Sequence, residues 1–432
     1  MPAFEAFIGL RYDLTAVDLG AVMAPPYDVI SPAQRAELAA RHPANAVHVE
    51  LPVPGPDGVD RYRHAAGLLD RWLREGLLVR ERAPALYPYR MTPPVGCGAI
   101  TGVIGALRLG PGGPTILPHE ETLSAPRTDR LDLLRATRAN LSPIWGLSLA
   151  PTFDVTSATR SAPALSVVDD DGVLHELWTV TDPVVHRTLD VAVAAAPVVI
   201  ADGHHRYRTA LAYQAECGPG AGDEPPWATG AAAIMAFVAP LSQAQTVVGP
   251  VHRAVTGIDG QIDLVAMLER WFDILPLGPV DGEALATLAN HPSLALLRAG
   301  RVWALRARPR RDHPDHPDVR ADDGEPHGSI GAAGATGGTG DAAATAIPGA
   351  GDPDAALLDA VLASLPPHQL SYCYSTDEAT RAAADGSADA VFLLRAPTVA
   401  QIADYAMTSR LMPPKTTYFW PKPRSGMVYR ML

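Results

Sequence analysis

Lysine is almost absent from this chain of 432 residues. The chain carries 35 basic residues, and only two of them, Lys415 and Lys422, are lysines. Both lie in one stretch near the C-terminus, 412–426, which reads MPPKTTYFWPKPRSG. The lysine ammonium is a compact point charge, whereas the arginine guanidinium is a broad planar group. Arginine therefore does not freely replace a lysine that must reach one oxygen in a tight pocket. The clustering favours a function for Lys415, whereas for Lys422, which lies between prolines, function and simple exposure stay equally open.

Cysteine and positive charge are also scarce. The three cysteines lie far apart without a CxxC pair, which indicates neither a disulfide framework nor a zinc site. The net charge of −12 argues against a broad nucleic-acid surface, but it leaves room for a local basic pocket that binds a small anion. The first residues do not resemble a signal peptide, and no apolar run is long enough to span a bilayer. We therefore expect a soluble, cytoplasmic protein that binds neither nucleic acid nor membrane.

Several common catalytic signatures are missing too. The chain has no GxxxxGK[ST] segment, no GxGxxG after a strand and no GxSxG segment, so it is not a P-loop enzyme and carries no nucleophile elbow. His119 is followed four positions later by Leu123, so the HExxH pattern of zinc proteases is absent as well. These absences leave phosphate and acid–base chemistry to be sought in other motifs.

The length predicts two or three domains. Apolar spacing predicts helices in SPAQRAELAARHP, capped by Ser31, and in DRYRHAAGLLDRWLREGLL, LVAMLERWF, DAALLDAVLASL and TVAQIADYAMTSRLM. ALYPYRM, GAITGVIGALRL and DAVFLLRA are typical of strands. The segment 308–353 has almost no large apolar residues and is predicted to be a disordered insertion. We expect an N-terminal α/β region at 1–110, a core at 111–275, and a C-terminal region at 276–307 and 354–432.

The strongest local motif is IADGHHRYRTA. An apolar strand at 197–201 runs into a turn at Asp202 and Gly203, and a helix with one apolar face follows. Backbone N–H groups at a helix start bind anions, and Gly203 would let a phosphate approach the backbone closely. His204, His205 and Arg206 add side-chain donors at the same point. The combination favours a phosphate site over a simple capped helix.

Two further motifs stay ambiguous from their residues alone. In ILPHEET, Glu120 could act as a general base, but a helix start with glutamates near its positive end is the favoured interpretation. In APPYDVIS, two prolines form a rigid turn before Tyr27 and Asp28. For Asp28, catalysis and plain turn chemistry are equally plausible.

Taken together, these motifs resemble a known bacterial family. IADGHHRY, ILPHEET, APPYDVIS and MPPKTTYFWPKPRSG resemble the domain-of-unknown-function 1015 proteins over nearly the whole chain, apart from the glycine-rich insertion. The blocks Pro118–Glu120, Ala201–Arg206 and Pro414–Thr417 also resemble, in the same order, those of the archaeal free-serine kinase of the ParB/sulfiredoxin-like fold. About a hundred residues before Pro118, including Asp28, have no counterpart in that kinase.

The resemblance implies an α+β protein with a ParB/sulfiredoxin-like phosphate-binding core at 111–275, an extra N-terminal α/β domain and a C-terminal α/β substrate domain. It implies a kinase that moves phosphate from ATP or ADP, with Mg²⁺, to the hydroxyl of free L-serine or a related hydroxy acid. It assigns Glu120 as catalytic base and no residue as a metal ligand. The nucleotide phosphates would be bound by Asp202, Gly203, His204, His205 and Arg206, and the substrate by His119, Lys415, Thr416 and Thr417.

Two other functions follow from the same fold. One is a ParB-like nucleotide-dependent switch or nucleic-acid-binding protein without kinase activity, against which the acidic composition counts. The other is sulfiredoxin-like redox repair, which needs a cysteine where this chain has His204. The kinase is therefore the favoured prediction.

Overall fold

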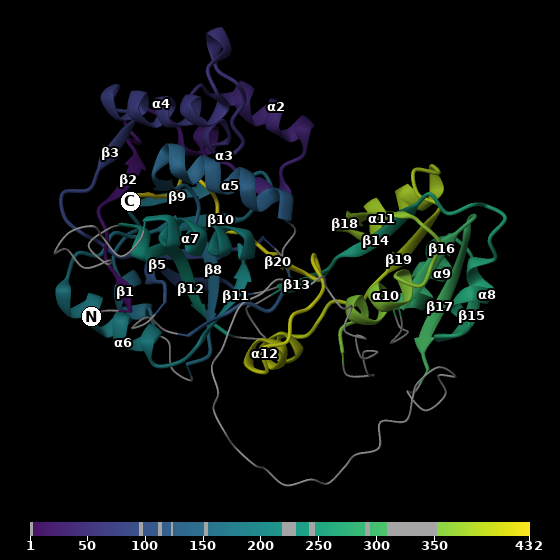
Figure 1. The fold of residues 1–432 in the computed structure, drawn as a ribbon. Helices are drawn as coiled ribbons and strands as arrows, with labels where there is room; N and C mark the ends of the chain where they lie inside the picture. The colour runs from purple at the N-terminus through teal and green to yellow at the C-terminus, as the bar shows by residue number, and fades with distance from the viewer. Residues whose placement is uncertain are drawn as a thin grey trace, which may run out of the picture. The chain divides into compact units, whose positions relative to one another are not determined.

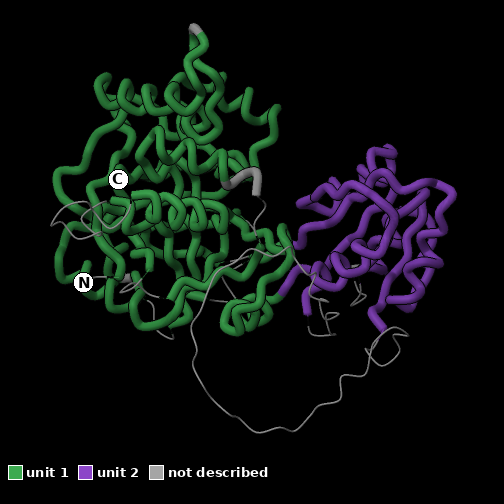
Figure 2. The backbone as a smooth tube through the Cα atoms, viewed as in Figure 1, with its two compact units in different colours: residues 1–249, 398–432 green, residues 250–397 purple. Residues whose placement is uncertain are grey.

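The computed structural model describes residues 3–94, 98–110, 115–121, 124–150, 154–217, 230–241, 247–289, 294–308 and 352–432. It divides into two compact units, shown in green and purple in Figure 2. Unit 1 comprises Met1–Gly249 and Thr398–Leu432, and unit 2 comprises Pro250–Pro397. Most of the predicted insertion, at 309–351, lies outside the described residues.

Unit 1 is built on a mixed nine-stranded sheet (Figure 1). Its strand order is β6-β11-β8-β12-β5-β4-β10-β9, with β1 paired to β5. The pairs β6–β11 and β8–β12 are parallel, and the other pairs are antiparallel. The strands are β1 (Phe4–Glu5), β4 (Tyr87–Thr92), β5 (Ile100–Arg108), β6 (Ile116–Leu117), β8 (Ile144–Ser148), β9 (Leu165–Val168), β10 (Leu174–Leu177), β11 (Val198–Asp202) and β12 (Ala233–Pro240).

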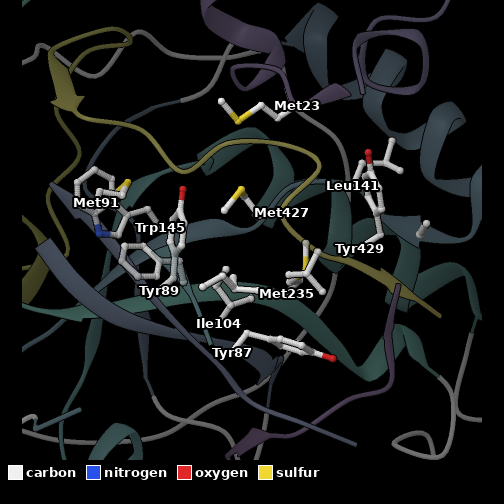
Figure 3. Close-up of a cluster of buried hydrophobic side chains, with 14 of the residues drawn as sticks. Met23, Tyr87, Tyr89, Met91, Ile104, Leu141, Trp145, Met235, Met427 and Tyr429 are labelled. Atoms are coloured by element: carbon white, nitrogen blue, oxygen red, sulfur yellow. The ribbon is translucent and has the colours of Figure 1, made fainter. Parts of the chain in front are cut away.

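The central strands β5, β8, β11 and β12 are buried on both faces, since nearly all their successive side chains, which point to opposite faces, are buried. In β11, Val198 joins a core formed with helices α6 (Pro183–Ala194) and α7 (His204–Cys217), whereas Val199 joins the core on the other face. Figure 3 shows part of that second core, in which Trp145, Met235 and Met427 come from segments far apart in the chain. The central strands therefore read as nearly continuous apolar runs.

The C-terminal residues return to unit 1 and complete it. A second sheet has the antiparallel order β3-β2-β21-β7. The predicted N-terminal region at 1–110 is thus no separate unit, since β4 and β5 belong to the central sheet and β2 pairs with β21. The four strands are β2 (Gly9–Tyr12), β3 (Leu78–Arg80), β7 (Ala139–Asn140) and β21 (Tyr429–Met431).

Most predicted helices of unit 1 are present. Ser31 caps α2 through a reciprocal capping box with Gln34, as predicted. The amphipathic helix α4 buries Leu68, Leu69 and Trp72. Among the described residues, none of the helices has the length and apolarity needed to cross a bilayer. The remaining helices are α1 (Leu19–Val22), α2 (Pro32–Arg41), α3 (Val47–Glu50), α4 (Arg61–Arg74), α5 (Ser124–Thr137) and α12 (Val399–Met407), and a 3₁₀ turn, η1, spans Tyr27–Val29.

Unit 2 is a six-stranded antiparallel sheet with two helices against each face. Leu268 of α8 and Leu358 of α10 lie in one core, and Ala284 of α9 and Ala379 of α11 lie in the other. The predicted helix LVAMLERWF is shorter than expected, because β15 begins at Phe272. The strand order is β15-β17-β16-β19-β14-β18. The strands are β14 (His252–Thr256), β15 (Phe272–Pro279), β16 (Leu294–Arg298), β17 (Arg301–Ala307), β18 (Gln369–Cys373) and β19 (Ala390–Leu393). The helices are α8 (Leu264–Leu268), α9 (Gly282–Ala289), α10 (Asp354–Leu362) and α11 (Thr376–Ala384). The chain therefore has the predicted mixed α+β character.

Candidate functional site

Two of the sequence motifs lie side by side in unit 1. Glu120 and Met412 form a parallel bridge, in which the Met412 N–H donates to the His119 carbonyl oxygen at 2.7 Å. The Glu121 N–H donates in turn to the Met412 carbonyl oxygen at 2.9 Å. Glu120 is therefore not at a helix start, the interpretation favoured by its residues alone, since α5 begins only at Ser124.

The Pro-Lys-Thr-Thr block forms a cup around the Glu120 carboxylate. The backbone N–H of Lys415 donates to Oε1 at 2.9 Å, and the backbone N–H groups of Thr416 and Thr417 donate to Oε2 at 3.0 and 3.1 Å. The Thr417 hydroxyl adds a bond of 3.1 Å to Oε2. Lys415 has a φ of +60°, and such a left-handed residue turns successive N–H groups toward one point, which makes an anion-binding concavity. This block, predicted to bind substrate, thus also orients the predicted base.

The surroundings of Glu120 suit a proton acceptor. Its side chain is buried, and this burial raises the pKa of its carboxyl group, although the N–H bonds and the charge of Lys415 oppose that change. Among the described residues, Oε1 accepts a single hydrogen bond, whereas a carboxylate oxygen can accept two. Glu120 therefore combines a fixed orientation with remaining acceptor capacity and enhanced basicity.

Two buried histidines link Glu120 to the start of α7. The rings of His119 and His204 are nearly perpendicular with centroids 4.7 Å apart. The backbone N–H of His119 donates to His204 Nε2 at 3.4 Å. His119 Nε2 lies 3.1 Å from the Thr417 hydroxyl. Burial lowers the pKa of His119 to about 4 and that of His204 well below its usual value. Both rings are therefore neutral near pH 7, so His204 offers no positive charge to a phosphate, and His205 beside it is half-buried.

The turn before α7 is shaped by a bulge and a glycine. The pairing of β11 with β8 shifts by one residue between Ile200 and Asp202, which re-aims the end of the strand. Gly203 has a φ of +93°, and a β-carbon there would lie 3.0 Å from Ile144 Cγ2 and 3.1 Å from Arg206 Nε. Only glycine fits this position without strain, so the turn itself requires it, and the close approach of a phosphate to its backbone stays a prediction.

Asp202 belongs to a chain of alternating charges. Arg206 donates to Asp202 Oδ2 at 2.6 Å and also to the Pro143 carbonyl oxygen, while Lys422 donates to Asp202 Oδ1. The Lys422 ammonium lies 3.3 Å from Asp28 Oδ2 as well. Burial alone would raise the pKa of Asp28, but the charges of Lys422, Arg206 and Lys415 together outweigh it and lower that pKa strongly. Asp28 and Lys422, whose roles the sequence left open, are thus joined to the predicted phosphate block.

A cavity of about 60 Å³ lies beside Arg206, between α5 and α7. Its wall includes Tyr27, Arg130 and Thr209 together with leucines of α5. The Thr209 side chain is buried, and its hydroxyl has no hydrogen-bond partner in the described part of the chain. No local sequence pattern indicates this cavity, because nothing nearby marks a threonine within a helix as a lining residue.

A resident metal ion does not fit the described residues. Nowhere in the described ranges do three or more histidine, cysteine, aspartate or glutamate side chains come close enough together to hold one. Both oxygens of Asp202 already accept hydrogen bonds, from Arg206 and Lys422. A lysine ammonium lies where two carboxylates could otherwise share a cation.

Comparison with known proteins places the chain in a family. No curated protein matches it. A conserved hypothetical protein from Pyrococcus furiosus matches with 13% identity over 71% of this chain and 87% of that chain, with a TM-score of 0.35. A free serine kinase in complex with AMP matches with 13% identity over 71% and 83%, with a TM-score of 0.36. SbnI with C-terminal truncation from Staphylococcus aureus matches with 10% identity over 73% and 82%, with a TM-score of 0.34. Since the model of one family matches residues 4–324, the chain belongs to the family described as protein of unknown function, DUF1015.

Proposed function

We propose that this protein is a small-molecule kinase with a ParB/sulfiredoxin-like core, which transfers phosphate from ATP or ADP to the hydroxyl of free L-serine or a related hydroxy acid. The observation that carries the proposal is the Glu120 carboxylate, buried and held by three successive N–H groups beside the histidine pair. The order of the three sequence blocks supports the same assignment.

In the proposed reaction, Glu120 Oε1 accepts the proton of the substrate hydroxyl. The hydroxyl oxygen then forms a bond to the terminal phosphorus of the nucleotide, and the bond from that phosphorus to the leaving phosphate oxygen breaks. Raising the pKa of Glu120 by burial makes the carboxylate a better proton acceptor. Phosphoryl transfer otherwise depends on positioning and charge stabilisation, so one well-oriented base is a sufficient acid–base group.

In this proposal the nucleotide phosphates bind at the start of α7. The first N–H groups of this helix, Gly203 and Arg206 favour an anion there. The cavity with the unpartnered Thr209 hydroxyl adjoins Arg206 and would receive another part of the nucleotide. Magnesium would come bound to the nucleotide and neutralise phosphate charge, since the described residues do not form a resident metal site.

The test is a screen for phosphorylated products. The full chain is incubated with Mg²⁺, each of ATP and ADP, and a panel of hydroxy amino acids and hydroxy acids, and the products are read by mass spectrometry. We expect O-phosphoserine or a related phosphate ester from wild-type protein and none from Glu120→Gln. Glu121→Gln is the matched control, since that neighbouring side chain is exposed and should leave the reaction intact.

The outcome that overturns the proposal is equally concrete. If wild-type protein forms no phosphate ester with either donor and any acceptor, the kinase assignment fails. If Glu120→Gln and Glu121→Gln both retain the wild-type rate, the base is not Glu120.

A further inference from the structure

The Lys422 ammonium lies in a place that a divalent cation could take. It is hydrogen-bonded to Asp202 Oδ1 and lies 3.3 Å from Asp28 Oδ2. Its side chain is only 7% exposed. A lysine is almost never buried to this degree unless it is paired, and here two carboxylates from segments far apart in the chain pair with it. They come from η1 and from the end of β11.

Lys422 and Arg206 both keep N–H donors that the described residues do not use. An ammonium has three N–H donors, and two of them serve Asp28 and Asp202 in the described part of the chain. Arg206, which shares Asp202 with Lys422, has a buried Nε without a hydrogen-bond partner there. Leaving a buried donor unpaired is unfavourable, so a polar ligand or an ordered water is expected to accept a hydrogen bond from it.

The unused donors lie next to an anion-binding element. Asp202 is followed directly by Gly203 and by the 14-residue helix α7, whose first N–H groups carry partial positive charge. Arginine and lysine are the side chains that bind phosphate oxygens most strongly. The two cations and the helix start therefore converge on one small region of unit 1.

We infer that Lys422 takes the place of a resident metal ion: it binds a phosphate group of the nucleotide directly, while Asp28 and Asp202 hold its ammonium in position. The inference rests on the proposed nucleotide site, but it concerns binding alone and does not require phosphoryl transfer. It also gives the N-terminal APPYDVIS motif a role, since Asp28 positions a cation rather than acting as a base.

The experiment measures ADP binding by calorimetry in the presence of EDTA, with the full chain. Wild-type protein is expected to bind ADP without metal. Lys422→Met is expected to bind it about 10- to 100-fold more weakly, the usual size of one lost charged hydrogen bond. Arg80→Met is the control, because it removes one positive charge from an exposed position on β3 and should bind like wild type.

A second variant and a second measurement distinguish a loss of the binding site from a loss of the fold. Asp28→Asn combined with Lys422→Met removes one charge of each sign, so it should stay folded by circular dichroism and still lose ADP affinity. Wild-type protein titrated with Mn²⁺ without nucleotide, followed by electron paramagnetic resonance, should bind no ion tightly.

Three results would overturn the inference. They are wild-type protein that fails to bind ADP in EDTA, a folded Lys422 variant that binds ADP within twofold of wild type, and one tightly bound Mn²⁺ that disappears in Asp202→Asn. Absence of any phosphorylated product with ADP binding retained would refute the proposed kinase and leave this inference standing.

Discussion

Replacing Lys422 by methionine should destabilise unit 1 markedly at neutral pH. The substitution keeps an unbranched side chain of similar length but removes the charge between Asp28 and Asp202. Breaking a buried ion pair by removing one partner costs about 3–5 kcal/mol, because the remaining charge stays buried and unpaired. Arg206 still pairs with Asp202, so the unpaired charge falls mainly on Asp28. We expect a loss of about 3 kcal/mol, the lower end of that range.

The pH dependence of this loss has a definite sign. In wild-type protein the pKa of Asp28 is lowered by Lys422, so its charged form stabilises the fold above the pKa of the unfolded chain. Without the ammonium, burial is opposed only by Arg206, Lys415 and a backbone hydrogen bond, so the pKa of Asp28 is lowered less, and the stability difference between wild type and variant grows as the pH rises. The loss should therefore be complete near pH 7 and should shrink only as the pH falls below the ordinary pKa of an aspartate.

Urea unfolding at pH 7.5 and pH 2.5, followed by tryptophan fluorescence and circular dichroism, measures the loss and its decrease in acid. Asp28→Asn alone and in the Lys422→Met background completes a double-mutant cycle. The double variant should be more stable than Lys422→Met alone, because the unpaired charge is gone. A loss below about 1 kcal/mol at pH 7.5, as for an exposed pair, or strictly additive effects of the two substitutions, would refute the buried ion pair.

Three more predictions follow from single contacts. Thr417→Val removes a hydroxyl donor from Glu120 Oε2, so the carboxylate is less stabilised, its pKa rises further, and the pH–rate profile for phosphate-ester formation shifts upward; an unchanged profile would contradict the contact. Asp169 has a pKa of about 2, since the His175 hydrogen bond and the charge of Arg424 outweigh the effect of burial, so it stabilises the fold above its ordinary pKa and that stability is lost as the pH falls toward 2. Asp169→Asn should therefore cost about 2 kcal/mol at pH 7 in urea unfolding and little at or below pH 2, and a cost independent of pH would count against this. Gly203→Ala places a β-carbon 3.0 Å from Ile144 Cγ2 at a φ of +93°, so it should lower stability by about 1–2 kcal/mol, whereas Gly58→Ala, at a positive φ with no atom within 4 Å, should cost less.

Local elements were predicted well where the sequence itself carries the signal. The strand, turn and helix around Gly203 appear as β11 and α7, since an apolar run, a glycine and a helical period follow one another there. Within α7, Ala210 of the predicted apolar face is buried and packs on the sheet. Ala215, which the helical period places on the same face, is exposed near the end of the helix.

Features that depend on distant segments were not predictable in the same way. The residues around Glu120 favoured a helix start, but a bridge to Met412 places this glutamate on the Lys415 turn. Lys422 looked equally suited to an exposed position between prolines, because nothing nearby reveals that Asp28 and Asp202 approach it. The expected boundary at residue 110 differs from the structure for the same reason, since strand partners come from either side of it.

The rate of phosphate-ester formation by Glu120→Gln tests the central claim most directly. Both proteins are saturated with nucleotide and serine in single-turnover experiments, after calorimetry has shown that ADP still binds. General-base catalysis contributes about 10²- to 10⁴-fold, so the variant should react at least about 100-fold more slowly than wild type and Glu121→Gln at the wild-type rate. A Glu120→Gln rate within a few-fold of wild type would contradict the assignment of Glu120 as the base.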